Sequence, residues 1–154
     1  MILQTLQIRS IRSDFSSLEL NLKQETFVTL ENTEKQFLKI IAKPYAWAIR
    51  SEMKQGNIQE IDSYLNAMVR SGNFSSVMVV NNRGTVISAT NDGYVGEYYI
   101  SFGSPYFLNV DSTIVYKAHE GLLTTASPIR DGNEKIGTLI IDYATRSRDV
   151  FRDQ

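Results

Sequence analysis

The sequence contains no cysteine, one histidine and almost no net charge, and each shortage excludes a class of protein. Without cysteine, the 154-residue chain has no disulfide, no thiolate metal ligand and no cysteine nucleophile. A net charge of −1 and a pI near 5.8 provide neither a basic surface for nucleic acid nor a polybasic membrane-binding segment. No run approaches the roughly 18 apolar residues of a membrane helix. We therefore expect any membrane span of the protein to lie outside this sequence.

The single histidine also argues against catalysis. A catalytic triad needs a base beside a nucleophile, and zinc sites usually need several histidine or cysteine ligands. His119 stands beside Glu120 and Gly121 at an expected turn, where a solvated histidine is the simplest interpretation. The sequence contains no phosphate-binding loop and no dinucleotide-binding fingerprint. We therefore expect no enzyme, no metal site and no cofactor.

Apolar residues at alternating gaps of three and four predict a long N-terminal helix. This spacing is that of a coiled-coil seam, formed here by Ile8, Ile11, Phe15, Leu18 and Leu22. A wider apolar stripe follows between residues 37 and 48. Because no glycine or proline precedes Pro44, the helix is expected from about residue 4 onward. Pro44 predicts a kink or a break, and Gly56 suits a C-terminal cap.

A second helix is predicted to begin at "NIQE" (57–60). Asn57 is a suitable N-cap residue, and Glu60 stands at the position that completes a capping box. The stripe expected to be buried on this helix consists of Ile61, Leu65, Met68 and Val69.

From Ser75 onward the period changes from that of a helix to that of strands. "SSVMVV", "NNRG" and "TVISAT" predict a strand, a turn and a strand. Three more strands are expected at 112–118, 122–129 and 135–144, and the hairpin turns make neighbours antiparallel. This order predicts an α+β domain, with a long N-terminal helix packed on one face of a mostly antiparallel five-stranded sheet.

Between the second and third predicted strands lies "YVGEYYISFGSPYF" (94–107), which we call the aromatic segment. It holds six aromatic residues among glycines, serines and a proline, so it is not one regular element. The long helix can cover only one face of the sheet, so the segment is expected to cover the other. Its rings would then either fill a core or line a pocket against the sheet.

Asp142 ends the apolar run of the last predicted strand. A carboxylate on a largely buried strand needs a partner. Three possibilities remain open: an ion pair with Lys or Arg, a solvated strand end, or a pocket that admits a cationic or hydrogen-bond-donating ligand.

Three stretches, in this order and spacing, resemble the Cache domains, the extracytoplasmic PAS-like sensor fold. They are "VMVVNNRGTVISATND" (77–92), "VGEYYISFGSPYF" (95–107) and "LLTTASPIRDGNEKIGTLIIDY" (122–143). The resemblance covers nearly the whole chain and implies a PAS-like sheet. It also implies a ligand-sensing module of a bacterial receptor, with the long helix rising from a first membrane span.

The resemblance assigns roles to individual residues. Tyr99 matches a tyrosine that touches ligand in the amino-acid-binding branch, and Tyr106 and Phe107 match the two aromatics that follow the proline of the family's segment. Asp142 matches the aspartate that takes a ligand amino group. Ser104 stands where that branch has the arginine that takes a ligand carboxylate, and its loss removes a bidentate clamp.

Two further residues lie on strands that should border the cavity. These are Tyr116 and Thr124, whereas Lys117 should point away from the side that Tyr116 faces.

The resemblance implies three parts: a helix at 1–56 with a coiled-coil stalk, a PAS-like sensor core at 57–143, and a tail at 144–154 toward a second membrane span. The function implied is an extracytoplasmic sensor of a histidine kinase, diguanylate cyclase or chemoreceptor, in the periplasm or outside the cell, anchored in the inner membrane. Its expected partners are a small ligand (an organic acid, amine or amino-acid-like molecule) and a second copy bound through the N-terminal helix. An intracellular PAS-like interaction module without ligand remains the alternative.

Overall fold

The computed structural model of the chain describes residues 2–146 and confirms the α+β class expected from the sequence. Within these residues, the helices are α1 (Ile2–Gln55) and α2 (Ile58–Arg70). The strands are β1 (Phe74–Asn81), β2 (Val86–Ala89), β3 (Ile114–His119), β4 (Leu122–Asp131) and β5 (Glu134–Ala144). Three short 3₁₀ turns between β2 and β3 are η1 (Asp92–Tyr94), η2 (Tyr99–Ser101) and η3 (Pro105–Asn109). Most of the expected C-terminal tail, residues 147–154, lies outside the described residues.

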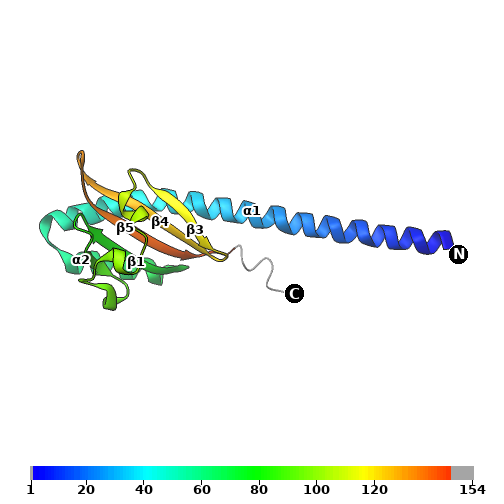
Figure 1. Cartoon of the computed structure of the whole chain (residues 1–154), viewed down its shortest axis with the longest axis horizontal. Coiled ribbons are helices and arrows are strands. Elements are labelled where there is room, and N and C mark those ends of the chain that lie inside the picture. The colour runs from blue at the N-terminus through cyan, green and yellow to red at the C-terminus, as the bar shows by residue number, and fades with distance from the viewer. Residues whose placement is uncertain (1, 147–154) are drawn as a thin grey trace.

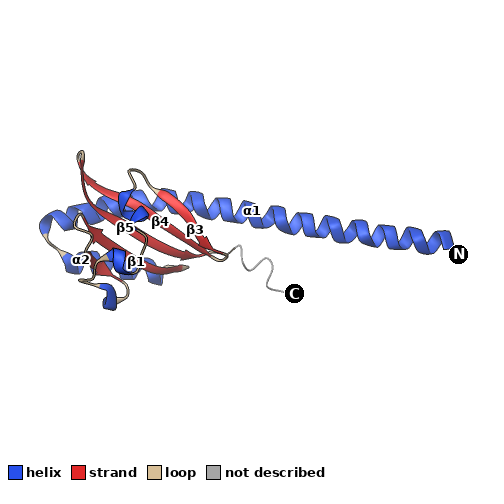
Figure 2. Ribbon diagram, viewed as in Figure 1, coloured by secondary structure: helices blue, strands red, loops and turns tan. Residues whose placement is uncertain are grey.

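The strands form one five-stranded sheet in the order β2-β1-β5-β4-β3, and every neighbouring pair is antiparallel. The last strand of the sequence, β5, therefore lies at the centre, hydrogen-bonded to β1 on one side and β4 on the other. Figure 1 shows α1 running along one face of this sheet, and Figure 2 shows the same layering by element type.

The main core lies between the two helices and one face of the sheet. It is formed by Ala42, Ala46 and Ile49 of α1, Ile61, Leu65 and Met68 of α2, and Val77, Val79, Ile129, Leu139 and Ile141 of the sheet. The buried stripe predicted for α2 is thus confirmed, with Val69 packed at its margin. At the far end of the same face, Phe37, Phe74 and Tyr143 pack ring against ring, with centroids 5.4 to 6.4 Å apart.

Helix α1 runs for 54 residues through Pro44, so the break, one of the two outcomes expected there beside a kink, does not occur. Proline removes the hydrogen bond to the carbonyl four residues earlier, that of Ile40. Both Pro44 and Ile40 lie on the exposed face of α1, where water can satisfy that carbonyl. On the opposite face, buried Ala42 and Ala46 hold the helix against the sheet on both sides of the proline.

The turn between the helices uses Gly56 as expected but not Asn57. Gly56 has φ +70°, the left-handed conformation that ends many helices at glycine. The predicted capping box at Asn57 is wrong, because the Asn57 side chain makes no capping hydrogen bond. Its ψ of 70° departs from the extended conformation that an N-cap residue normally adopts. Instead, the Asn57 amide donates to the Glu52 carbonyl at 2.9 Å and the Gly56 amide to the Met53 carbonyl at 3.1 Å, so both amides cap the C-terminus of α1.

The first half of α1 extends beyond the sheet (Figure 1). The side chains of the predicted seam are exposed there, from 53% for Ile8 to 70% for Phe15. Apolar exposure continues along the part of α1 that packs on the sheet, where Ile40 and Trp47 are each 69% exposed. One side of α1 therefore carries apolar side chains that no described residue covers.

Candidate ligand-binding pocket

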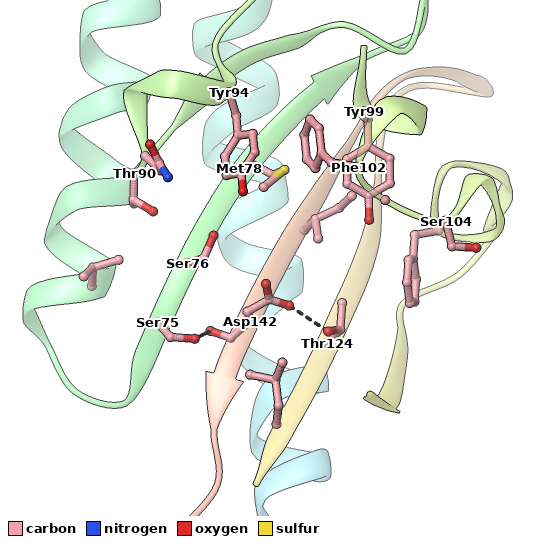
Figure 3. A pocket seen from close by; sticks show the side chains of 16 residues that line it. Ser75, Ser76, Met78, Thr90, Tyr94, Tyr99, Phe102, Ser104, Thr124 and Asp142 are labelled. Carbon is pink, nitrogen blue, oxygen red and sulfur yellow. Dashed lines mark hydrogen bonds between the residues drawn. The ribbon is translucent and has the colours of Figure 1, made fainter. Parts of the chain in front are cut away.

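A cavity of about 630 Å³ lies between the aromatic segment and the face of the sheet opposite α1. This size is within the range of small-molecule sites, about 300–1,000 Å³. Its floor comes from β1, β4 and β5 and its cover from the aromatic segment (Figure 3). The prediction that this segment covers the face away from the helix is confirmed, and the rings both pack as core and line the cavity.

Strand alternation positions Asp142 in the floor of the cavity. On β5, Leu139 and Ile141 face the helices, so Ile140 and Asp142 face the other way. Asp142 pairs with Thr124 of β4 on one side. The Thr124 hydroxyl, on a residue only 7% exposed, donates to Asp142 Oδ1 at 2.7 Å. A charged group thus stands on the central strand with one fixed hydrogen bond.

A β-bulge on β1 brings two consecutive serines to the cavity. In a regular strand, neighbouring side chains point to opposite faces. The register between β1 and β5 shifts between Phe74 and Ser76, and both Ser75 and Ser76 line the cavity. The Ser75 hydroxyl donates to the backbone carbonyl of Asp142 at 3.2 Å. The bulge therefore adds the Ser75 hydroxyl to that of Ser76 on the side of the cavity where β1 pairs with Asp142.

The electrostatics of the cavity are dominated by this single carboxylate. Among the described residues that line it, none is Lys, Arg or His, and Asp142 is the only acid. Burial raises the pKa of Asp142, and the Thr124 hydrogen bond and the positive charge of nearby His119 offset the effect only in part. Burial, with the Asp142 charge as a second cause, raises the pKa of Tyr99 to about 12, so its phenol stays protonated.

Stacked rings form the cover. Tyr94 and Phe102 stack with centroids 4.2 Å apart, and Tyr99 meets Phe102 edge-on at 5.3 Å. In Figure 3 the hydroxyls of Tyr94 and Tyr99 point from the cover toward the floor, where Asp142 lies. The cover therefore presents aromatic faces together with two phenol groups.

Gly103 fixes the position of the Tyr99 ring. A Cβ atom at residue 103 would lie 2.2 Å from Tyr99 Cζ and 2.6 Å from both Cε atoms. The Gly103 amide also donates to the Tyr99 carbonyl at 2.8 Å, which folds the chain back beneath the ring. Only glycine leaves room for this contact.

Ser104 caps the 3₁₀ turn η3 at the edge of the cavity. Its hydroxyl accepts a hydrogen bond from the Tyr106 amide at 3.3 Å. Ser104 therefore has a local structural role at the position where the resemblance expects an arginine.

The structure brings five of the seven predicted site residues to the cavity: Tyr99, Ser104, Phe107, Thr124 and Asp142. Tyr106 and Tyr116 lie outside its lining and are 59% and 52% exposed. Their rings instead flank Phe107, with centroids 5.7 and 5.8 Å from it. Lys117 points to the helix side, as predicted, where it binds Glu31 of α1 at 3.0 Å.

Several lining residues were not expected from the sequence. They include Ser75, Ser76, Thr90, Asn91, Tyr94 and Phe102. Strand alternation alone could have indicated Ser76 and Met78, whereas Ser75 depends on the bulge.

Within residues 2–146, no group of three His, Asp or Glu side chains is close enough together to hold a metal ion. No helix in the same range combines the length and the apolarity that crossing a membrane requires.

The chain has the fold of PAS-like sensor domains, with a long N-terminal helix on one face of a five-stranded antiparallel sheet. It is similar to the sensor domain of the histidine kinase DctB from V. cholerae, with a TM-score of 0.63 and 12% identity over 88% of this chain and 59% of that one. It is also similar to the ligand-binding domain of the Campylobacter jejuni chemoreceptor Tlp3 in complex with L-valine. There the TM-score is 0.52, with 18% identity over 85% of this chain and 58% of that one. The chain thus spans about three fifths of the length of each structure. No protein-family model and no curated protein sequence matches it.

Proposed function

We propose that the chain is a ligand-sensing domain of the Cache type, on the extracytoplasmic side of a bacterial transmembrane receptor. The observation that carries the proposal is the open cavity of about 630 Å³ with a half-buried carboxylate, Asp142, in its floor. A buried charge is unfavourable unless it is paired, and its one direct side-chain hydrogen bond among the described residues comes from a neutral hydroxyl. A small polar ligand would supply the missing partner.

The contacts of α1 support signalling through that helix. Lys117 of β3 binds Glu31 of α1, and the buried Glu34 carboxylate accepts the Arg146 amide at 2.9 and 3.2 Å. Arg146, just past the end of β5, is therefore hydrogen-bonded to the helix that extends away from the sheet. A ligand bound at Asp142 would contact β5, the strand that leads to Arg146. A displacement of β5 would shift α1, and α1 would pass that shift to a kinase, cyclase or chemotaxis output domain.

The exposed seam of α1 supports a parallel homodimer. Its heptad spacing is that of two-stranded coiled coils, but a coiled coil of only about two heptads is marginally stable by itself. Residues 1–154 contain no cysteine, so only cysteines outside this sequence have to be replaced before introduced ones are cross-linked. We expect Leu18→Cys, on the seam, to form a disulfide-linked dimer in the full-length receptor in membranes. Leu20→Cys, also exposed at 51% but off the seam, is the matched control. Equal cross-linking of both variants would contradict a dimer through the seam.

A thermal-shift screen tests the sensing function. The panel contains small amines, amino acids, carboxylates and neutral polyols, and a ligand at 100 times its Kd stabilises the folded state by about 2.7 kcal/mol. Any ligand of this cavity should lose its shift in Asp142→Asn, which keeps the acceptor for Thr124 but removes the charge. Asp92→Asn, an exposed acid on η1 that does not line the cavity, should retain the shift.

If no compound raises the melting temperature, the ligand-sensing proposal fails. An intracellular interaction module without ligand then becomes the better interpretation, and membrane spans flanking this domain in the full-length protein would argue against that module.

A further inference from the structure

We propose that the chain has a second ligand site, which takes a small organic carboxylate with an apolar body. A second cavity, of about 410 Å³, lies between the turn after β1, the end of the aromatic segment with η3, and the first half of β5. No described residue lines both this cavity and the first one, which holds Asp142. Its size is within the range of small-molecule sites, about 300–1,000 Å³. This site adds to the proposed sensing function and does not depend on it.

The lining of the second cavity is positively charged. Among the described residues that form it, Arg83 and Lys135 are cations and none is Asp or Glu. The first cavity has the reverse composition, with one carboxylate and no cation. An anion that enters the second cavity would therefore meet two opposite charges and no like charge.

A β-bulge brings Lys135 to this cavity. Lys135 and Thr138 are three residues apart on β5, so a regular strand would point them to opposite faces of the sheet. The register between β4 and β5 shifts between Ile129 and Arg130, and with this bulge both Lys135 and Thr138 line the second cavity. The irregularity therefore places a cation beside a hydroxyl on the face that the aromatic segment covers.

The Lys135 ammonium is held in place, but no described carboxylate pairs with it. Its Nζ donates to the carbonyls of Leu108 and Val110 at 2.6 and 2.8 Å, and an ammonium has three N–H donors, so one remains. The nearby Asp111 carboxylate pairs with Arg130 instead, at 3.2 Å. Burial and the charge of Arg130 lower the pKa of Lys135, and Asp111 offsets this only in part. A bound anion would supply the charge partner that this ammonium lacks.

Two further donors are available to the same anion. Thr138 is only 2% exposed, and its hydroxyl has no hydrogen-bond partner among the described residues. The exposed Arg83 side chain forms no ion pair within residues 2–146. The turn that carries Arg83 is fixed, because the Arg83 amide donates to Asn81 Oδ1 at 3.0 Å. Guanidinium, ammonium and hydroxyl groups together are donors that suit a carboxylate.

Apolar side chains form another part of the wall and favour an organic anion over an inorganic one. They are Tyr98, Ile100, Pro105 and Leu108. Tyr98 and Ile100 are 61% and 63% exposed, so an apolar ligand body that covers them removes apolar surface from water. Inorganic phosphate would satisfy the cations but leave this surface exposed.

Calorimetry with residues 1–154 at constant ionic strength compares four probes: benzoate, benzyl alcohol, benzylamine and inorganic phosphate. We expect benzoate to bind at least about tenfold more tightly than each of the other three. Arg83→Gln should weaken benzoate binding by about tenfold, as loss of a charge-assisted hydrogen bond does. Arg70→Gln, at an exposed arginine that lines neither cavity, is the matched control and should leave it unchanged. Lys135→Met is less suitable, because it also removes the hydrogen bonds to Leu108 and Val110.

Amide resonances locate the bound probe independently of any variant. In two-dimensional NMR spectra, benzoate should shift the amide signals of Arg83 and Gly84, which line the second cavity. The signals of Ser75 and Ser76, which line the first cavity, should stay in place.

The remaining outcomes overturn the inference. Shifts at Ser75 and Ser76 without shifts at Arg83 and Gly84 would place benzoate in the first cavity. Equal affinity of wild type and Arg83→Gln, or no binding of benzoate, would show that the second cavity is not a carboxylate site. Phosphate or benzyl alcohol binding as tightly as benzoate would refute the ligand class. None of these results touches the sensing function, which is tested separately through Asp142.

Discussion

The contact between Gly103 and the Tyr99 ring gives the sharpest test of how the cover is built. Gly103→Ala adds a single methyl group, which would lie 2.2 Å from Tyr99 Cζ, whereas ordinary contacts begin at 3.4 Å. The ring must therefore retreat by about 1.2 Å, and close-packed surroundings resist such a shift. Tyr99 is only 5% exposed and packs edge-on against Phe102, so the ring has little free space.

Overpacking of this kind costs about 1–3 kcal/mol of folding free energy. For a chain of this length, that corresponds to a fall of about 3–10 °C in Tm. Circular dichroism at 222 nm during heating and urea unfolding measures both quantities. The matched control is Gly72→Ala, because a Cβ atom there meets nothing within 4 Å and Gly72 has no positive φ. The control should change stability by less than about 1 kcal/mol.

A double-mutant cycle isolates the contact. In a Tyr99→Ala background, the methyl group at residue 103 has no ring to displace, so Gly103→Ala should become nearly neutral. If Gly103→Ala destabilises the wild type and the Tyr99→Ala variant equally, the loss does not come from this ring. If it is as harmless as Gly72→Ala, the described packing of the cover is wrong.

Three further results are expected. Since burial raises the folded-state pKa of Asp142, its charge opposes folding at neutral pH and the penalty disappears as pH falls through that pKa. Without ligand, Asp142→Asn should therefore have a higher Tm than wild type at pH 7, and this difference in Tm should shrink on acidification. A difference in Tm that does not change with pH would refute the link between Asp142 ionisation and stability. Glu34→Gln should destabilise the fold by about 1–3 kcal/mol and speed hydrogen exchange at the Arg146 amide, because that amide loses a charged acceptor. An unchanged exchange rate would contradict the hydrogen bond between the Arg146 amide and Glu34. Pro44→Ala should stabilise α1 by up to about 3 kcal/mol, measured by urea unfolding, since it restores a helix hydrogen bond on an exposed face; a loss of stability would show that proline is needed there.

Most of the fold follows from periodicity in the sequence. The change from a helical period to strand alternation at Ser75 predicted the α+β class, and hairpin turns predicted the antiparallel pairs. Local signals were less reliable where tertiary packing opposes them. Pro44 does not end α1, because the helix is held by buried contacts on both sides of it. Asn57 does not cap α2, because the short turn after Gly56 sets its backbone.

The candidate site was predicted in part, for a physical reason. Asp142 and Thr124 follow from strand alternation once the faces of the sheet are assigned, and both line the cavity. Tyr116 obeys the same alternation but lies on the edge strand β3, where the cover leaves it 52% exposed. Ser75 depends on a bulge between paired strands, and such an irregularity leaves no periodic signal in a sequence.

Strand β5 has a mechanical consequence beyond its place in the cavity. Near its start, Lys135 Nζ donates to the carbonyls of Leu108 and Val110, at 2.6 and 2.8 Å, and just past its end the Arg146 amide binds Glu34. Strand β5 thus connects the residues that directly follow the cover to the long helix. Strand β5 is hydrogen-bonded to β1 on one side and to β4 on the other. If β5 slid along its own axis, the hydrogen bonds to both neighbours would break at once. A movement that β5 passes from the cover side to α1 would therefore move the sheet as a whole, as a tilt or a shear of the sheet against α1.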